Sequence, residues 1–260
     1  MQSMQRKYWN GLSDFYQREM RISTDDFHYG PQIPGDSALK ILPPLGRGAR
    51  ALELGCGAAQ NSVFLARRGV ACTAIDISSS QLAHARQLAA AANVDVSFHC
   101  APIERFHEKA AGRFHLIHSS HAFEFLDRPG DVIARCARFL LPGGTLLIST
   151  VHPLYNGEWV DNIDEDGNPC GKGLFLENYF SPPDDVRRRD DGSVEVVSRA
   201  WPVSAWFAWM RSAGLDVTAL LEPPEQPGGI PPYTSPDWAD NDGELAAIPG
   251  TLIIAARRHA

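Results

Sequence analysis

The sequence lacks any apolar run that approaches the ~18–20 residues needed to cross a bilayer, so we expect no membrane partner. Its first ten residues also lack the apolar stretch of a secretory signal peptide, and we therefore expect a cytoplasmic protein. Basic residues are outnumbered, because 24 Lys and Arg stand against 31 Asp and Glu, for a net charge of −7. Nucleic-acid binding depends on neutralising phosphates, so this balance argues against an RNA or DNA partner.

Cysteine is scarce and shows no pattern. The five cysteines are odd in number, widely spaced and without a Cys-x-x-Cys pair (Cys56, Cys72, Cys100, Cys136 and Cys170). This distribution excludes a disulfide framework and a zinc site of the usual spacing, and it fits a reducing compartment. His118 and His121 have a spacing that occurs in metal sites, but no further ligand cluster accompanies them, so we expect no metal.

The most informative segment, residues 51–60, reads Ala-Leu-Glu-Leu-Gly-Cys-Gly-Ala-Ala-Gln. It indicates a strand that carries an acid, Glu53, a turn with glycines at 55 and 57, and a helix that begins immediately afterwards. Such a turn lets backbone N–H groups approach a cofactor closely. A dinucleotide site needs a small residue where Gln60 stands, and the Gly-Lys-Ser/Thr of a phosphate loop is missing. Glu53 would repel a pyrophosphate but suits S-adenosylmethionine (SAM), which carries an ammonium and a cationic sulfur.

Strand-like and helix-like segments alternate along most of the chain. We predict strands at 50–54, 71–76, 94–99, 113–119, 145–150, 215–221 and 251–256. We predict helices at 59–68, 78–92, 129–141 and 204–213. This order predicts an α/β fold with a Rossmann-like, seven-stranded, mostly parallel sheet and helices on both faces. A chain of 260 residues fits a single domain over 1–260.

Two segments interrupt the alternation. Residues 1–48 are aromatic and polar, then rich in Gly and Pro, and we expect them to form an N-terminal cap. Residues 152–200 follow the fifth strand without a helical period but with several aromatic side chains. Long connections inside α/β domains are often functional, so we predict that this insertion lies on the substrate side.

Three motifs resemble those of class I SAM-dependent methyltransferases of the small-molecule type. The first is Glu53-x-Gly55-x-Gly57, the second is Asp76 at the end of the second strand, and the third is the segment 140–146, Leu-Leu-Pro-Gly-Gly-Thr-Leu. The resemblance implies that the first motif binds the cofactor and that the Asp76 carboxylate binds the ribose hydroxyls.

The resemblance also implies contacts for the rest of the cofactor. Ile77 would lie against the adenine, and Ser119 would contribute from the end of the fourth strand. The family commonly places an Asp where this chain has Pro102, so Ile103 and backbone groups would hold the adenine instead. We expect Tyr16 or Tyr29 to close over the sulfonium, because an aromatic face attracts a cation.

The predicted strand ends carry candidates for the chemistry. His121 follows the fourth strand and His152 follows the fifth, so both would border the transferred methyl group, either as a general base or as hydrogen-bonding groups. Further side chains in the cap and the insertion are predicted to contact the substrate (His28, Tyr155, Trp159 and Tyr179).

The function implied by the resemblance is methyl transfer from SAM to oxygen or nitrogen of a small, flat or partly apolar acceptor of specialised metabolism, releasing S-adenosylhomocysteine (SAH). Two alternatives stay open at this point. One is a non-catalytic SAM-binding sensor or partner protein, and the other is a nicotinamide-dependent oxidoreductase, which Gln60 disfavours. The sequence does not predict an oligomeric state.

Overall fold

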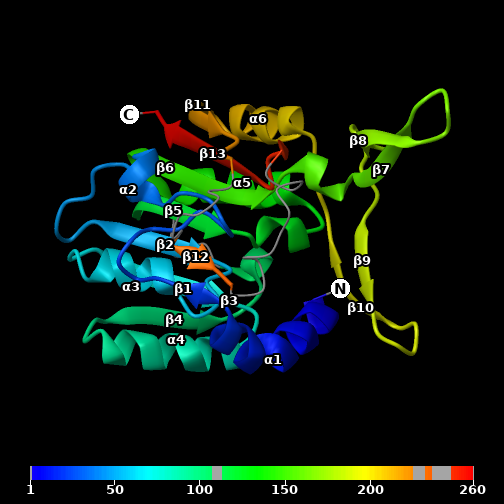
Figure 1. Ribbon diagram of the computed structural model, residues 1–260. Coiled ribbons are helices and arrows are strands. Elements are labelled where there is room, and N and C mark those ends of the chain that lie inside the picture. Colours follow the sequence, from blue (N-terminus) through cyan, green and yellow to red (C-terminus); the bar gives the residue numbers. More distant parts are fainter. Residues whose placement is uncertain (1, 107–112, 225–231, 236–246, 260) are drawn as a thin grey trace.

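A computed structural model describes residues 2–106, 113–224, 232–235 and 247–259. Its centre is a seven-stranded sheet in the order β11-β13-β6-β5-β2-β3-β4 (Figure 1). The strands are β2 (Arg50–Leu54), β3 (Ala71–Asp76), β4 (Val96–Cys100), β5 (Phe114–Ser120), β6 (Leu140–Val151), β11 (Leu215–Leu221) and β13 (Thr251–Arg258). Neighbouring strands are parallel except at β13, which runs antiparallel to both β6 and β11. The predicted Rossmann-like sheet is confirmed.

Helices cover both faces of this sheet. They are α3 (Gln60–Ala66), α4 (Ser79–Ala91), α5 (Pro129–Phe139) and α6 (Val203–Ser212), with the short α2 (Asp36–Leu39) before β2. Successive strand residues point to opposite faces of the sheet and contribute to two apolar clusters. On one face Leu52 and Ile148 pack with α5 and α6, and on the other Ala51 and Leu147 pack with α3 and the segment before β2. This alternation follows from the two-residue period of a strand.

Local sequence signals explain most element ends. The Ser78 hydroxyl accepts a hydrogen bond from the Gln81 N–H at 3.1 Å and so caps α4. Gly214, at φ +74°, takes the left-handed conformation that commonly ends a helix. One boundary was predicted wrongly, because β6 begins at Leu140 rather than at residue 145. The pairing with β5 jumps from Leu140 to Thr145, and the Pro-Gly-Gly residues bulge out of the ladder.

The insertion after β6 forms two antiparallel hairpins. One pairs β7 (Glu158–Ile163) with β8 (Pro169–Phe175), and the other pairs β9 (Asp185–Arg188) with β10 (Val194–Ser198). Both project to one side of the sheet, and β7–β8 reaches furthest (Figure 1). A 3-10 turn, η4 (Pro153–Asn156), connects them to β6.

The N-terminal segment begins with an 18-residue helix, α1 (Gln2–Glu19). This helix lies against α4 and β10. The segment after it contains a short strand, β1 (Arg21–Ile22), which pairs antiparallel with β12 (Tyr233–Thr234). Among the residues that the structure describes, no helix has both the length and the apolar character needed to span a membrane.

Candidate functional site

A pocket opens at the carboxyl ends of β2, β3 and β5, where the strand order reverses direction. This is the position at which open α/β sheets bind their ligands. The space within the pocket, counted together with the part that is open to solvent, is about 940 Å³. The turn after β2, the end of β3, the segment after β5 and helix α1 contribute most of the lining.

The glycines of the first motif shape the floor of the pocket. Gly55 has φ +69°, and a Cβ atom there would lie 2.3 Å from the Ala122 Cβ. Gly57 has φ +52° and donates its N–H to Asp76 Oδ2 at 2.8 Å. Only glycine combines this backbone conformation with so close an approach. The turn is therefore open to a bound cofactor, and Asp76 is fixed beside it.

Two buried carboxyl groups face this floor. Asp76 also accepts the Ser78 N–H at Oδ1 (2.8 Å), and burial raises its pKa despite these hydrogen bonds. Glu53 accepts the N–H and the hydroxyl of Ser62, while burial raises its pKa to about 8. Both carboxyl groups accept hydrogen bonds, so one could bind a pair of hydroxyl groups and the other an ammonium. Ile77, Pro102 and Ile103 line the adjacent wall, so the residues present fit SAM.

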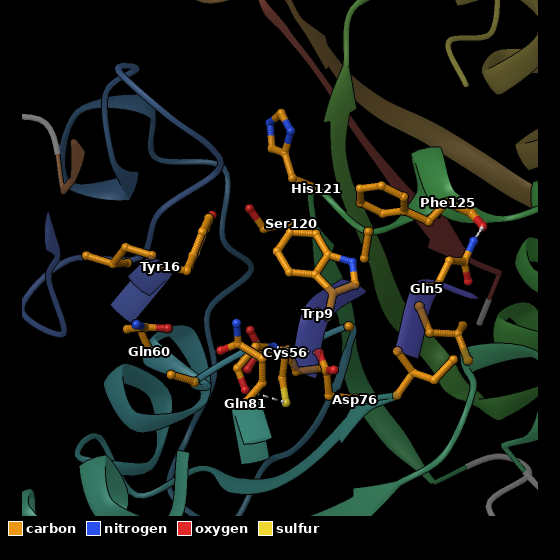
Figure 2. A pocket seen from close by; sticks show the side chains of 18 of the residues that line it. Gln5, Trp9, Tyr16, Cys56, Gln60, Asp76, Gln81, Ser120, His121 and Phe125 are labelled. Carbon is orange, nitrogen blue, oxygen red and sulfur yellow. Dashed lines mark hydrogen bonds between the residues drawn. The ribbon is translucent and has the colours of Figure 1, made fainter. Parts of the chain in front are cut away.

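A chain of aromatic rings forms the opposite wall. Trp9 of α1 contacts Phe125 (ring centroids 5.6 Å apart) and Tyr16 (5.7 Å), and Tyr16 contacts Tyr233 (6.5 Å). Tyr233 in turn contacts His28 at 5.4 Å. These rings give the pocket a long apolar face suited to a flat ligand. Figure 2 shows Asp76 and His121 at opposite ends, with Trp9 and Ser120 between them.

His121 stands at the far end from Asp76, directly after β5. Its backbone has φ +51°, and its N–H donates to the Ser149 carbonyl at 2.9 Å. Its ring Nδ1 lies 3.3 Å from Glu124 Oε1, and Nε2 lies 3.1 Å from Thr251 Oγ1. The side chain is 22% exposed and lines the pocket, so a ligand can reach the imidazole.

Two further polar side chains at this end carry unsatisfied atoms. Neither His28 Nδ1 nor Ser120 Oγ, both buried, has a hydrogen-bond partner in the described part of the chain. Burial and, to a lesser extent, nearby His121 lower the pKa of His28 to about 3, so its imidazole is neutral. An unpaired buried polar atom costs ~1–3 kcal/mol, which a ligand that bonds to it recovers.

Two predicted cofactor residues lie outside the pocket. Tyr29 is buried in the core beside Phe27 and donates its hydroxyl hydrogen bond to Asp36 at 2.6 Å, so its predicted closure over the sulfonium is corrected. Ser119 donates to the Leu54 carbonyl at 2.7 Å within the sheet. Successive strand residues face opposite sides, and Ser120 lines the pocket instead.

His152 and the predicted substrate residues of the insertion lie outside this pocket. His152 is buried beneath η4, where Nδ1 accepts the Leu154 N–H and Nε2 lies 2.8 Å from Glu222 Oε1. Both ring nitrogens are thus engaged, and His152 does not line the pocket. Three predicted substrate residues, Tyr155, Trp159 and Tyr179, lie on the insertion and away from the lining. The remaining predicted site residues all line the pocket: His28, His121, Tyr16, Glu53, Gly55, Gly57, Asp76, Ile77 and Ile103.

The sequence analysis predicted an N-terminal cap and Tyr16, but not the polar bridge that α1 makes over the pocket. Gln17 donates to Gln81 Oε1 at 2.9 Å and accepts from Gln60 Nε2 at 3.1 Å, which ties the helix to α3 and α4 over the pocket. Trp9, which was not among the predicted site residues, also lines the pocket, and it lies seven positions before Tyr16, on the same face of the helix. Gln60, whose size argued against a dinucleotide site, lines the pocket and is held there by its hydrogen bond to Gln17.

The comparisons with known proteins agree with this geometry. The model of the family described as "Methyltransferase domain" matches residues 51–144. The ubiquinone biosynthesis O-methyltransferase of Caulobacter sp. (strain K31) is 30% identical over 181 residues, which are 67% of this chain and 71% of the relative. The corresponding protein of Xanthomonas axonopodis pv. citri is 33% identical over 182 residues, 68% of each chain.

A solved SAM-dependent methyltransferase from Mesorhizobium loti superposes with a TM-score of 0.65 and 23% identity, covering 85% of this chain and 96% of that one. At that identity the likeness shows the fold alone. For other ubiquinone biosynthesis O-methyltransferases the match is shorter, and the matching 105 residues span only 42–45% of the relative's length.

Proposed function

Because this chain belongs to the class I SAM-dependent methyltransferases, it transfers a methyl group from SAM to a small molecule, and we propose that the acceptor is a hydroxyl on a flat, largely apolar ring. The observation that carries the proposal is the aromatic wall that runs from Asp76 to the imidazole of His121. The family assignment leaves the nicotinamide alternative without support. The names of the sequence relatives, which are O-methyltransferases, favour oxygen over nitrogen.

The chain holds the cofactor at the floor of the pocket. Asp76 would bind the ribose hydroxyls, Glu53 the ammonium, and Ile77 and Ile103 the adenine. When bound, SAM supplies an electrophilic methyl group on a sulfonium and leaves as SAH. Tyr16 lies on the aromatic wall, where its ring face would stabilise a nearby cation by about 0.5–2 kcal/mol.

The acceptor would lie along the rings of Trp9 and Phe125 with its hydroxyl at His121. An aromatic or aliphatic hydroxyl is protonated near neutral pH and becomes a good nucleophile only as the proton leaves. His121 Nε2 would take this proton and exchange its contact with Thr251 for one with the acceptor. The unsatisfied His28 Nδ1 and Ser120 Oγ would hydrogen-bond the acceptor's polar substituents.

The test compares two phenols that differ in acidity, 4-methoxyphenol and 4-nitrophenol, at pH 8 with product detection by mass spectrometry. The first is protonated at this pH and needs a base, whereas the second is largely ionised. We expect His121→Ala to slow methylation of 4-methoxyphenol by about 10²–10⁴-fold, the usual contribution of a general base. Methylation of 4-nitrophenol and the affinity for SAH should change little.

Three outcomes contradict parts of this proposal. Equal losses on both phenols would remove the base role from His121. Turnover of matched anilines but of no phenol would move the acceptor atom to nitrogen. Tight SAH binding without turnover of any acceptor in a broad panel would favour the second candidate, a SAM-binding sensor, for which the substitution at Pro102 is the motivating observation.

A further inference from the structure

Glu124 is a buried carboxyl group beside the imidazole of His121, on the 3-10 turn η3 (Phe123–Phe125) that follows β5. Its Oε1 lies 3.3 Å from His121 Nδ1, and its Oε2 accepts the Thr150 hydroxyl at 3.1 Å. The backbone N–H of Arg199 donates to the Glu124 carbonyl at 2.8 Å and fixes the turn. The carboxylate therefore has a fixed position and a fixed direction.

The backbone of His121 fixes the other half of this pair. Its left-handed conformation is uncommon for a non-glycine residue, and such strain concentrates at functional sites. Gly30 lies against the ring, because a Cβ there would come within 2.4 Å of Nε2. With Nδ1 directed to Glu124, Nε2 is left beside Thr251.

The Nδ1–Oε1 separation of 3.3 Å is an ion-pair distance, and a lone pair on Nδ1 would be repelled by the carboxylate, so this contact favours a proton on Nδ1. Nε2 then carries the lone pair, and the Thr251 hydroxyl donates to it. Two other titratable groups face the pair, His28 and Tyr16. Burial holds both neutral, since it lowers the pKa of His28 and raises that of Tyr16.

We propose that Glu124 is a positioning residue that fixes the Nδ1–H tautomer of His121 and stabilises the imidazolium that forms during methyl transfer. The inference rests on the proposed function. The acceptor's O–H proton passes to His121 Nε2, the oxygen forms the new bond to the methyl carbon, and the carbon–sulfur electron pair stays on sulfur. Thr150 holds the second carboxylate oxygen, so that Oε1 stays directed at the ring.

The first measurement reads the tautomer of His121 directly and does not depend on enzyme turnover or on the activity of a variant. Nitrogen NMR of histidine-labelled protein, with His121 assigned from the spectrum of His121→Asn, reports which ring nitrogen bears the proton at pH 8. We expect Nδ1–H in the wild-type protein and a mixture or reversal in Glu124→Gln. A wild-type ring protonated at Nε2 would overturn the proposal.

The second measurement applies the two phenols to Glu124→Gln. We expect methylation of 4-methoxyphenol to fall about 10–100-fold, while that of 4-nitrophenol and the SAH dissociation constant stay within about twofold. The control is Glu177→Gln, an exposed acid on the insertion, which should match the wild type on both phenols.

Each further result has a definite meaning. Equal losses on both phenols with an unchanged tautomer would make Glu124 merely structural and overturn the proposal. If Glu124→Gln does not fold, the wild-type tautomer still decides. Absence of turnover on any hydroxyl acceptor would overturn the proposed function, and with it the stabilising role, whereas the tautomer result stands by itself for the orienting role.

Discussion

At the scale of single residues, Glu53 is a buried acid in the pocket that we propose binds the cationic cofactor. Burial raises its pKa to about 8, the Ser62 hydrogen bonds lower it, and nearby Asp76 raises it. At pH 7 the Glu53 carboxyl group is therefore protonated in about nine-tenths of the free protein molecules. A ligand ammonium favours the carboxylate, so binding should expel that proton.

We predict that SAH binding at pH 7 releases close to one proton and that affinity rises by up to about tenfold per pH unit between pH 6 and 7. The rise levels off above about pH 8, because Glu53 is then already ionised in the free protein. Calorimetry in two buffers of different ionisation enthalpy measures the released proton. Glu53→Gln should bind more weakly and release none, and a wild-type protein without proton release would contradict the role of Glu53.

At the scale of elements, the pocket is covered by α1 rather than by the insertion. Among the described residues, no side chain from β7 or β8 lines the pocket, and three large apolar residues of this hairpin are more than two-fifths exposed (Val160 42%, Ile163 57% and Phe175 55%). Glu158 pairs with Phe175 at the base of the hairpin, so the two ends lie close together.

We predict that a short Gly–Ser linker in place of residues 158–175 leaves the SAH dissociation constant within about twofold, because no cofactor contact is lost. Removal of residues 2–19 is the opposite control, since it deletes Trp9, Tyr16 and the Gln17 bridge, and should abolish tight binding. Titration calorimetry measures both. A tenfold loss in the hairpin variant would show that the insertion supports the cofactor site after all.

The sequence was sufficient for elements with a regular period or a defined turn. The Gly-x-Gly turn, Asp76 and the strand–helix order were predictable because local conformation and hydrophobic period determine them. The insertion was not, because its hairpins carry apolar residues on exposed faces. The predicted Ser119 and the observed pocket residue Ser120 are one position apart. Strand boundaries predicted from sequence carry an error of at least one residue, so the sequence could not choose between them. His152 occupies a strand end as predicted, but its ring turns away because Glu222, seventy residues later, binds it.

At the scale of the whole molecule, stability depends on buried imidazoles. His118 lies within β5, its ring centroid 5.1 Å from that of Phe27, and neither ring nitrogen has a hydrogen-bond partner in the part of the chain that the structure covers. Burial and, to a lesser extent, nearby His28 lower its pKa to about 3.

Within the described residues, no group of three or more His, Cys, Asp and Glu side chains could hold a metal ion.

Since the folded pKa of His118 lies below the ordinary value of 6.5, the unfolded chain binds the extra proton. The resulting stability is present above pH 6.5 and is lost as the pH falls toward 3, by ~1.4 kcal/mol per unit. The pKa of Glu53 is raised from 4.5 to about 8, so its contribution to stability decreases as the pH rises between these values. The pH dependence of the total unfolding free energy therefore contains both effects. A comparison of variants isolates the histidine.

We predict that His118→Leu gains stability relative to the wild type by ~2.5 kcal/mol between pH 7 and pH 4.5, because leucine cannot take up the proton that opposes folding. Urea unfolding at four pH values measures this difference, and His99→Leu, at an exposed position on β4, is the control that should stay flat. Parallel curves for His118→Leu and the wild type would mean that His118 is solvated enough to titrate normally. The acid sensitivity of the fold would then originate elsewhere, with His28 at the acceptor end of the pocket as the next group to replace.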